Sequence, residues 1–281
     1  MYFLVTGSST GIGEACARWL DRRGHVVFAG VRREADAERL KTASSERLRP
    51  IQLDVTDPSS ISRARQEVES ATGADGLAGL VNNAGIAVAG PLEYLPIEAL
   101  RLQLEVNVVG QIAVTQAFLP LLRRGRGRVV LMGSIGGRFS TPFLGPYCAS
   151  KFALEALADA LRVELQPWRI HVAIVEPGSI ATPIWNKSDG DTARALSGAA
   201  GSVERDYGAA MAGVRHAAAE TGRRGLSPDV VAEVVEHALM APRPRTRYLV
   251  GRDARFRALL GMLLPDRLRD RLVTRALKLP R

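Results

Sequence analysis

Short apolar runs alternate with longer segments of helical periodicity over residues 1–180. Apolar runs bounded by turn residues are typical of buried strands. They predict strands over residues 2–5, 25–29, 49–53, 77–82, 128–133 and 169–175, and a further strand over 247–250. The longest predicted helices cover residues 99–124 and 146–166.

The alternation of strand and helix indicates a parallel sheet that helices cover on both faces. Right-handed crossovers then give a doubly wound α/β sheet of the Rossmann type, with seven strands in the order 3-2-1-4-5-6-7. Ligands bind beyond the carboxyl ends of the strands in such a sheet. We therefore expect residues 1–250 to form one catalytic domain whose site lies at that edge.

A glycine-rich turn, T-G-S-S-T-G-I-G over residues 6–13, follows the first predicted strand and precedes a helical segment that ends at Gly24. Glycines allow a sharp turn and a close approach to a pyrophosphate. The N-terminus of the next helix offers N–H groups and the positive end of its dipole. This context predicts a dinucleotide site, although the spacing G-x-x-x-G-x-G differs from the common G-x-G-x-x-G. The alternative is an ordinary glycine-rich loop.

A tyrosine and a lysine lie four positions apart in Y-C-A-S-K, residues 147–151, at the start of the second long helix. This spacing puts both side chains on one helical face. A nearby cation favours the phenolate and lowers the pKa of the phenol, which suits a general acid or base. Such a pair alone is common on solvated helices. Because Ser134 lies thirteen residues upstream of the tyrosine, we interpret the three side chains as one site.

Together these motifs resemble the short-chain dehydrogenase/reductase superfamily, in its single-domain branch. The matched segments are T-G-x-x-x-G-I-G at 6–13, N-N-A-G at 82–85, and P-G at 177–178 with Thr182. The residues that match the family's catalytic tetrad are Asn107, Ser134, Tyr147 and Lys151. The resemblance runs in order from residue 1 to about 185, and more loosely to about 250.

The resemblance implies an oxidoreductase that transfers a hydride between a nicotinamide dinucleotide and an alcohol or ketone. In such an enzyme Tyr147 is the general acid or base, Ser134 holds the substrate oxygen, and Lys151 also binds the nicotinamide ribose. Asn107 supports a proton-relaying water where its helix bends. The expected cofactor-binding residues are Gly7, Ser9, Thr10, Gly11, Ile12, Gly13, Arg32, Arg33, Asp54, Val55, Asn83, Ala84, Gly85, Tyr147, Lys151, Pro177, Gly178, Ile180 and Thr182.

The end of the second predicted strand decides between NADP(H) and NAD(H). An acid there binds the ribose of NAD, whereas an arginine accommodates the 2′-phosphate of NADP. The sequence reads V-R-R-E over residues 31–34, with valine at the acid position. We favour NADP(H) because guanidinium binds phosphate well, and NAD(H) through Glu34 is the alternative. Arg32 and Arg33 could instead form a solvated helix start, and Asp54 either lies beside the adenine, as the resemblance implies, or caps a turn.

Apolar residues near these motifs suggest a lipophilic alcohol or ketone of steroid, retinoid or fatty type. Residues 183–226 correspond to the family's variable substrate lid. The run 139–146 and the C-terminal extension are similar to those of retinol and hydroxysteroid dehydrogenases. A 3-ketoacyl-thioester reductase is the alternative, because its tetrad is the same. The expected substrate-binding residues are Ser134, Phe143, Tyr147, Ile184 and Trp185.

The net charge of +9 is concentrated at the C-terminal end. Residues 251–281 hold nine Arg or Lys and three Asp, a net charge of +6, with leucines at helical spacing on either side of Pro265. We expect a basic amphipathic helical extension that packs on its own domain or on a partner subunit. Peripheral contact with an anionic membrane is the alternative. Nucleic-acid binding is not expected, because interleaved aromatic residues are lacking.

The remaining composition narrows the class of protein. Cys16 and Cys148 give neither a disulfide framework nor metal spacing, so a reducing cytoplasm is expected. Four scattered histidines indicate no metal site. No apolar run approaches the roughly 18 residues of a membrane span. The resemblance implies a homodimer or homotetramer. A catalytically silent dinucleotide-binding regulator is the rival class, and the retained tyrosine and lysine argue against it.

Overall fold

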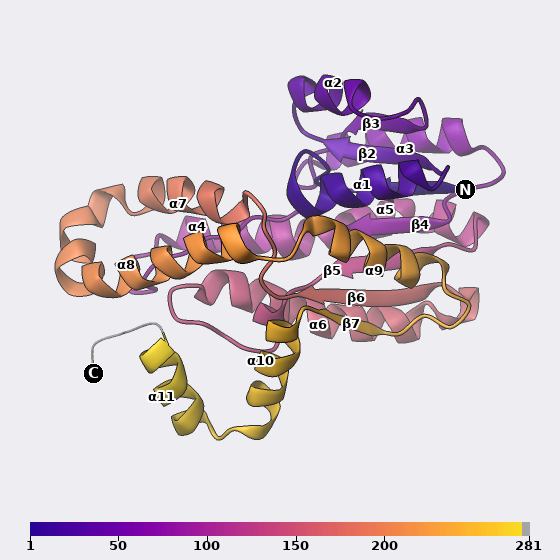
Figure 1. Ribbon diagram of the computed structural model, residues 1–281. Coiled ribbons are helices and arrows are strands. Elements are labelled where there is room, and N and C mark those ends of the chain that lie inside the picture. Colours follow the sequence, from indigo (N-terminus) through magenta and orange to yellow (C-terminus); the bar gives the residue numbers. More distant parts are fainter. Residues whose placement is uncertain (277–281) are drawn as a thin grey trace.

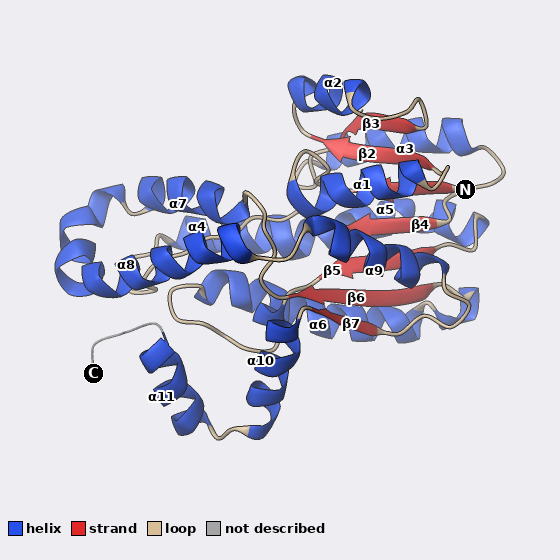
Figure 2. Ribbon diagram, in the orientation of Figure 1, coloured by secondary structure: helices blue, strands red, loops and turns tan. Residues whose placement is uncertain are grey.

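Seven parallel strands form one sheet in the order β3-β2-β1-β4-β5-β6-β7. The computed structural model describes residues 1–276, apart from the side chains of residues 185–187, 189, 191, 218 and 221. The strands are β1 Tyr2–Val5, β2 Val26–Val31, β3 Leu48–Gln52, β4 Gly79–Asn82, β5 Arg128–Met132, β6 His171–Pro177 and β7 Arg247–Val250. Figure 2 shows them as a single twisted layer. The predicted doubly wound fold and its strand order are confirmed.

Helices cover both faces of this sheet (Figure 1). Apolar side chains of α1, α2 and α9 pack on one face, and those of α3, α5 and α6 pack on the other. The helices are α1 Gly11–Arg22, α2 Glu34–Thr42, α3 Pro58–Thr72, α4 Ile97–Leu104, α5 Gly110–Arg124, α6 Gly145–Glu164, α7 Ile184–Ala195, α8 Ala200–Arg224, α9 Pro228–Met240, α10 Arg252–Leu263 and α11 Asp266–Ala276. Burial of both faces explains why the strands are apolar runs rather than alternating sequences.

The strand order reverses beside β1, which lies between β2 and β4. The loops that follow β1 and β4 therefore leave in opposite directions and open a crevice at the carboxyl edge. On the other side of β1, β2 continues to Val31, which pairs with Gln52 of β3. This strand is longer than its predicted range of 25–29. As a result, Arg32 leaves the sheet directly at the edge where the crevice opens.

The helix predicted over residues 99–124 is one helical stretch from Ile97 to Arg124, interrupted by a π-helical turn at Glu105–Val109. By length and composition this stretch could cross a membrane, so the expectation that no such segment exists was wrong. Its inward side chains pack on the sheet, and Phe118 is fully buried. These contacts are those of a core helix.

A helical lobe extends from the carboxyl edge of the sheet (Figure 1). It contains α7 and α8, which lie within the predicted lid at residues 183–226. A separate small core holds the lobe on the domain and consists of Val88, Leu95, Leu196 and Val203. The predicted lid is therefore a pair of packed helices.

The helices α10 and α11 follow β7 and flank Pro265. The first turn of α10 belongs to the domain, because the Asp253 carboxylate accepts a hydrogen bond from the Ser179 backbone N–H at 2.8 Å and Ala254 is fully buried. Beyond this turn Phe256 and Met262 are exposed. Apolar side chains point to several sides of α10, whereas those of α11 lie mainly along one side.

Thr6 joins the two strands on either side of the crevice. Its side chain is buried at the end of β1, and its hydroxyl accepts hydrogen bonds from the backbone N–H groups of Asn83 at 3.0 Å and Ala84 at 2.9 Å. Both residues follow β4. The threonine of the glycine-rich turn therefore fixes the separation of the two loops.

Replacement of Thr6 by Val should destabilise the protein. The substitution leaves the Ala84 N–H without an acceptor and removes one of the two acceptors of the Asn83 N–H. We therefore expect a loss of about 1–3 kcal/mol in the free energy of unfolding. Thr72→Val is the matched control, because the buried Thr72 hydroxyl donates to carbonyls of its own helix, those of Val68 and Glu69. Urea unfolding of both variants measures the difference, and an equal effect of the two would contradict this role of Thr6.

Candidate active site

The glycine-rich turn packs closely against the end of β4. Gly7 has a φ of +66°, and a Cβ on it would lie 2.7 Å from the Ala84 Cα atom. Gly11 has a φ of +63°. A Cβ on Gly13 would lie 2.2 Å from the Gly7 carbonyl oxygen. Left-handed backbone and close packing thus explain the three glycines.

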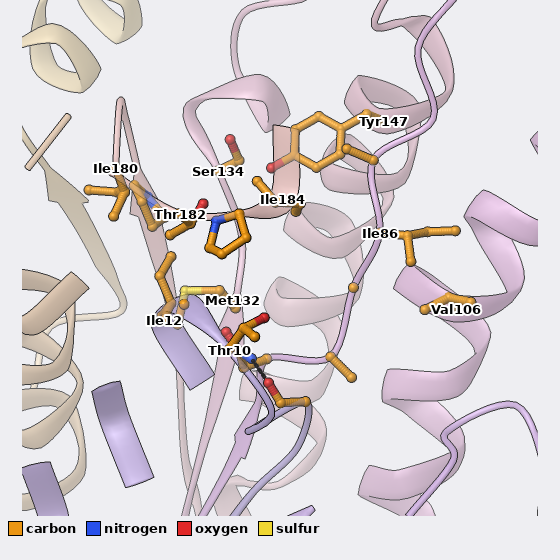
Figure 3. A pocket seen from close by; sticks show the side chains of 18 of the residues that line it. Thr10, Ile12, Ile86, Val106, Met132, Ser134, Tyr147, Ile180, Thr182 and Ile184 are labelled. Carbon is orange, nitrogen blue, oxygen red and sulfur yellow. Dashed lines mark hydrogen bonds between the residues drawn. The ribbon is translucent and has the colours of Figure 1, made fainter. Parts of the chain in front are cut away.

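A cavity opens above this turn, at the carboxyl ends of the strands (Figure 3). Of the expected cofactor-binding residues, those that line it are Gly7, Ser9, Thr10, Gly11, Ile12, Arg32, Asp54, Val55, Asn83, Ala84, Gly85, Tyr147, Lys151, Pro177, Gly178, Ile180 and Thr182. They come from loops far apart in the sequence. The topology of the sheet therefore gathers the predicted residues at one place.

Two expected cofactor residues do not line this cavity. Gly13 lies behind the turn, where it packs on Gly7. Arg33 is the N-cap residue of α2, and its guanidinium binds the Asp36 carboxylate at 2.9 Å. Arg33 is therefore a residue of the helix start, as the alternative interpretation expected, whereas Arg32 lines the cavity.

The polar residues at the strand ends have structural partners as well. The Asn83 side-chain amide donates to the backbone carbonyls of Thr6 at 3.0 Å and Gly7 at 3.1 Å. One Asp54 carboxylate oxygen accepts from the Thr56 N–H at 2.9 Å and from its hydroxyl at 2.8 Å. Asp54 thus caps a turn and also lines the cavity.

Ser134 and Tyr147 face each other across the upper part of the cavity (Figure 3). Ser134 follows β5, and its hydroxyl oxygen accepts a hydrogen bond from the Gly136 N–H at 3.0 Å. Tyr147 lies in the first turn of α6. Burial raises the pKa of Tyr147 to about 12, and a side-chain hydrogen bond with Ser134 acts in the opposite direction. The phenol is therefore protonated at neutral pH.

Lys151 lies one helical turn beyond Tyr147 and is also buried. Its Nζ donates a hydrogen bond to the Met132 carbonyl oxygen at 2.7 Å and lies 5.6 Å from the centre of the Tyr147 ring. Burial lowers the pKa of Lys151 to about 8. The sequence predicted that the cation would lower the pKa of the phenol, but in this structure desolvation dominates both groups: it raises the pKa of the phenol and lowers that of the amine.

Asn107 lies in the π-helical turn and is fully buried. Its side-chain amide donates to the Ile86 carbonyl at 3.0 Å and to the Ser150 hydroxyl at 3.1 Å, and its oxygen accepts from the Ile86 N–H at 2.8 Å. A π-helical turn interrupts the helix where a bend was expected. The side chain positions the loop after β4 and the start of α6, and it does not line the cavity.

A second cavity continues from Ser134 and Tyr147 toward the helical lobe. Its walls include apolar side chains from the segment after β5 and from α8, namely Ile135, Phe139, Leu144, Met211 and Val214. The Ser134 and Tyr147 hydroxyls therefore face an apolar cavity on the side opposite the glycine-rich turn.

The expected substrate-binding residues do not all line the two cavities. Ile184 lines the first cavity. Phe143 lines neither cavity, because its ring packs edge-on against Tyr207 at 5.9 Å, so this prediction is not supported. The Trp185 side chain lies outside the described residues. Linear neighbourhood could not show which way the backbone turns at Phe143, where φ is +65°.

Several arginines near the two cavities were missed by sequence reasoning. The Arg39 guanidinium, on α2, lies against the glycine-rich turn, where it donates to the Ser9 carbonyl and binds Glu14. Arg215 and Arg257 line the second cavity. They come from α8 and α10, and no local motif marks them.

The first cavity suits a dinucleotide. Helix α1 begins at Gly11 with no side-chain cap hydrogen bond from Thr10, so its first turn can offer N–H groups to an anion. A Cβ on Gly11 would lie 3.3 Å from Thr182, which shows how closely the segment before α7 approaches the turn. Arg32 adds positive charge at one end. These features fit a pyrophosphate and a neighbouring ribose phosphate.

Comparison with known proteins agrees with this site. The family model described as short chain dehydrogenase matches residues 2–193. The chain is 37% identical over 283 residues to the NADPH-dependent 3-dehydrocapnine reductase of Ornithobacterium rhinotracheale, covering 99% of this chain and 97% of that protein. It is 39% identical over 280 residues to human 17-beta-hydroxysteroid dehydrogenase type 6, covering 98% of this chain and 88% of that protein.

A solved structure shares the fold over nearly the whole length. The short chain dehydrogenase of Burkholderia cenocepacia, in complex with NADP, superposes with a TM-score of 0.72 at 26% identity, covering 98% of this chain and 96% of that one. The extent of the family match, the strand order and the gathered motifs lead to one conclusion. The chain belongs to the short-chain dehydrogenase/reductase family of NAD(P)-dependent oxidoreductases.

Proposed function

We propose that the protein interconverts a lipophilic ketone and its alcohol with NADP(H), and that Tyr147 exchanges the proton. The observation that carries this proposal is the position of the Ser134 and Tyr147 hydroxyls, which face each other where the glycine-turn cavity meets an apolar cavity. A carbonyl at this junction would be in reach of both hydroxyls. The nicotinamide supplies or accepts the hydride when it is bound.

Tyr147, Ser134 and Lys151 would each have a separate role in the proton transfer. In reduction the Tyr147 hydroxyl gives its proton to the carbonyl oxygen, and Ser134 donates a hydrogen bond that holds this oxygen in place. The charged Lys151 stabilises the phenolate that remains. A protonated phenol beside a charged amine is the pair that reduction requires, and the pKa values of about 12 and about 8 leave both groups in these forms at neutral pH.

NADP(H) is favoured over NAD(H) by Arg32, which follows β2 directly and lines the cavity. Arg39 brings a second guanidinium to the Ser9 end of the turn. No carboxylate follows β2 until Glu34 in the first turn of α2. The NADPH-dependent bacterial relative and the NADP-bound structure support the same choice.

The substrate class rests on the apolar wall of the second cavity and on the hydroxysteroid dehydrogenase relative. A 3-ketoacyl-thioester reductase remains the second candidate, because the same tetrad serves it. A silent regulator is disfavoured, since Ser134, Tyr147 and Lys151 are all present and gathered at one cavity.

Replacement of Tyr147 by Phe removes only the hydroxyl. We expect turnover of a ketone substrate to fall by about 10²–10⁴-fold, because the proton donor is lost, while NADPH still binds. Tyr2→Phe is the matched control, since Tyr2 begins β1, at the opposite edge of the sheet from the site. Steady-state assays at the reduced-nicotinamide absorbance measure turnover, and a near-normal rate in the Tyr147→Phe variant would exclude Tyr147 as the acid.

The affinity for NADPH should depend on pH through Lys151. Burial lowers the pKa of Lys151 to about 8 in the free protein. We expect the bound dinucleotide, with its negative phosphates, to favour the charged amine. Affinity is therefore full below pH 8 and should fall by up to about tenfold per pH unit above it. Fluorescence titration between about pH 6.5 and 9.5 measures the dissociation constant. A flat profile in the wild type, matching that of Lys151→Met, would rule out this linkage.

The two consecutive arginines after β2 allow a matched test of cofactor choice. Arg32→Ala should raise the dissociation constant for NADPH by about 10–100-fold and leave that for NADH within about twofold, because only NADPH carries the 2′-phosphate. Arg33→Ala should change neither constant, since Arg33 binds Asp36. Equal losses for the two cofactors, or a larger effect of Arg33→Ala, would refute the assignment.

A further inference from the structure

The second cavity is apolar along its walls but carries two arginines, Arg215 from α8 and Arg257 from α10. No aspartate or glutamate is among the described residues that line it. Its remaining polar lining consists of hydroxyls, a thiol and backbone atoms, which are uncharged at neutral pH. The described lining therefore has a net charge of +2, contributed entirely by the two guanidinium groups.

No described neighbour neutralises either guanidinium. Within the part of the chain that the structure describes, Arg215 and Arg257 take part in no ion pair. Other arginines on α8 are paired, as Arg205 is with Asp206 and Arg223 with Glu220. Two unpaired cations beside an apolar wall attract an anion, because low-dielectric walls strengthen their field.

Both arginines are carried by anchored helices. The hydroxyls of Tyr94 and Tyr207 tie α8 to the loop before α4 through Asp206 and Glu93, at 2.6 and 2.8 Å. Helix α10 is held through Asp253 at its first turn. These contacts fix the backbone positions of both arginines at the cavity mouth, where their side chains are exposed.

We propose that the substrate is an anionic amphiphile, whose carboxylate, sulfonate or phosphate is bound by Arg215 and Arg257 while its carbonyl lies between Ser134 and Tyr147. Guanidinium forks bind such oxyanions through paired hydrogen bonds. The apolar walls between the two ends accept the hydrocarbon part. This inference rests on the proposed ketone–alcohol chemistry and specifies its substrate class.

The probes are 4-, 6-, 8- and 10-oxododecanoate, each with its methyl ester. The ester keeps the chain and the ketone and removes only the charge. At the spacing that suits the cavity, kcat/KM should be about tenfold or more higher for the acid than for the ester. Raising the salt concentration should raise KM for the acid and leave the ester unchanged.

Arg215→Gln and Arg257→Gln should each lower kcat/KM for the acid toward the value for the ester, so that most of the tenfold ratio between acid and ester is lost. Arg255→Gln is the control, because Arg255 is exposed on α10 but does not line the cavity. Calorimetric titration with decanoate and with decan-1-ol measures the same preference without turnover. Tighter binding of decanoate in the wild type, lost in the two cavity variants only, is the expected result.

Three outcomes overturn the inference. Acids and esters could be used equally by the wild type, the variants could lose both substrates alike, or decanoate could bind no tighter than decan-1-ol. In each case turnover of the esters that depends on Tyr147 would leave the proposed function intact. Ketone turnover that does not respond to Tyr147→Phe would instead reject the proposed function, whatever the arginines do.

Discussion

One hydrogen bond, from the buried Lys151 amine to the Met132 carbonyl oxygen, is the contact on which the rest of the site depends. It joins α6 to the end of β5 at 2.7 Å. Because Tyr147 lies one turn before Lys151, and Ser134 lies two residues after Met132, the same bond brings the two hydroxyls together. Together with the hydrogen bond from Asn107 to Ser150, it fixes the start of α6 relative to the strand ends. The desolvation that this burial imposes also sets the charge states of the site, a neutral phenol beside an amine that is charged up to about pH 8.

Much of the fold could be predicted from local signals. The apolar runs and the helices between them are enough to order the seven strands, because right-handed crossovers leave few choices. The convergence of the glycine-rich turn with the loops after β4, β5 and β6 could be predicted too, because the carboxyl ends of parallel strands share one edge. Strand ends were less predictable. The continuation of β2 to Val31 depends on pairing with β3, which no local pattern records.

The failures in the site have a common physical origin in side-chain direction and long-range packing. Arg32 and Arg33 are adjacent and the sequence alone does not distinguish them, yet the Asp36 carboxylate forms an ion pair with Arg33 at the start of α2. Phe143 is close to Tyr147 along the chain, but left-handed backbone turns its ring toward Tyr207. Arg215 and Arg257 reach the apolar cavity from α8 and α10, far from any motif. Each outcome depends on contacts that a linear motif does not record.

The two cavities of this oxidoreductase meet at a pair of hydroxyls, one cavity suited to a dinucleotide and the other lined largely by apolar side chains. The proposed chemistry requires the substrate carbonyl to lie at this junction. A crystal structure with NADPH and an unreactive ketone analogue tests this claim most directly. We predict that the analogue's oxygen lies within about 3.2 Å of both the Tyr147 and Ser134 hydroxyl oxygens. An analogue bound beside the cofactor with its oxygen beyond hydrogen-bond reach of Tyr147 would contradict the account.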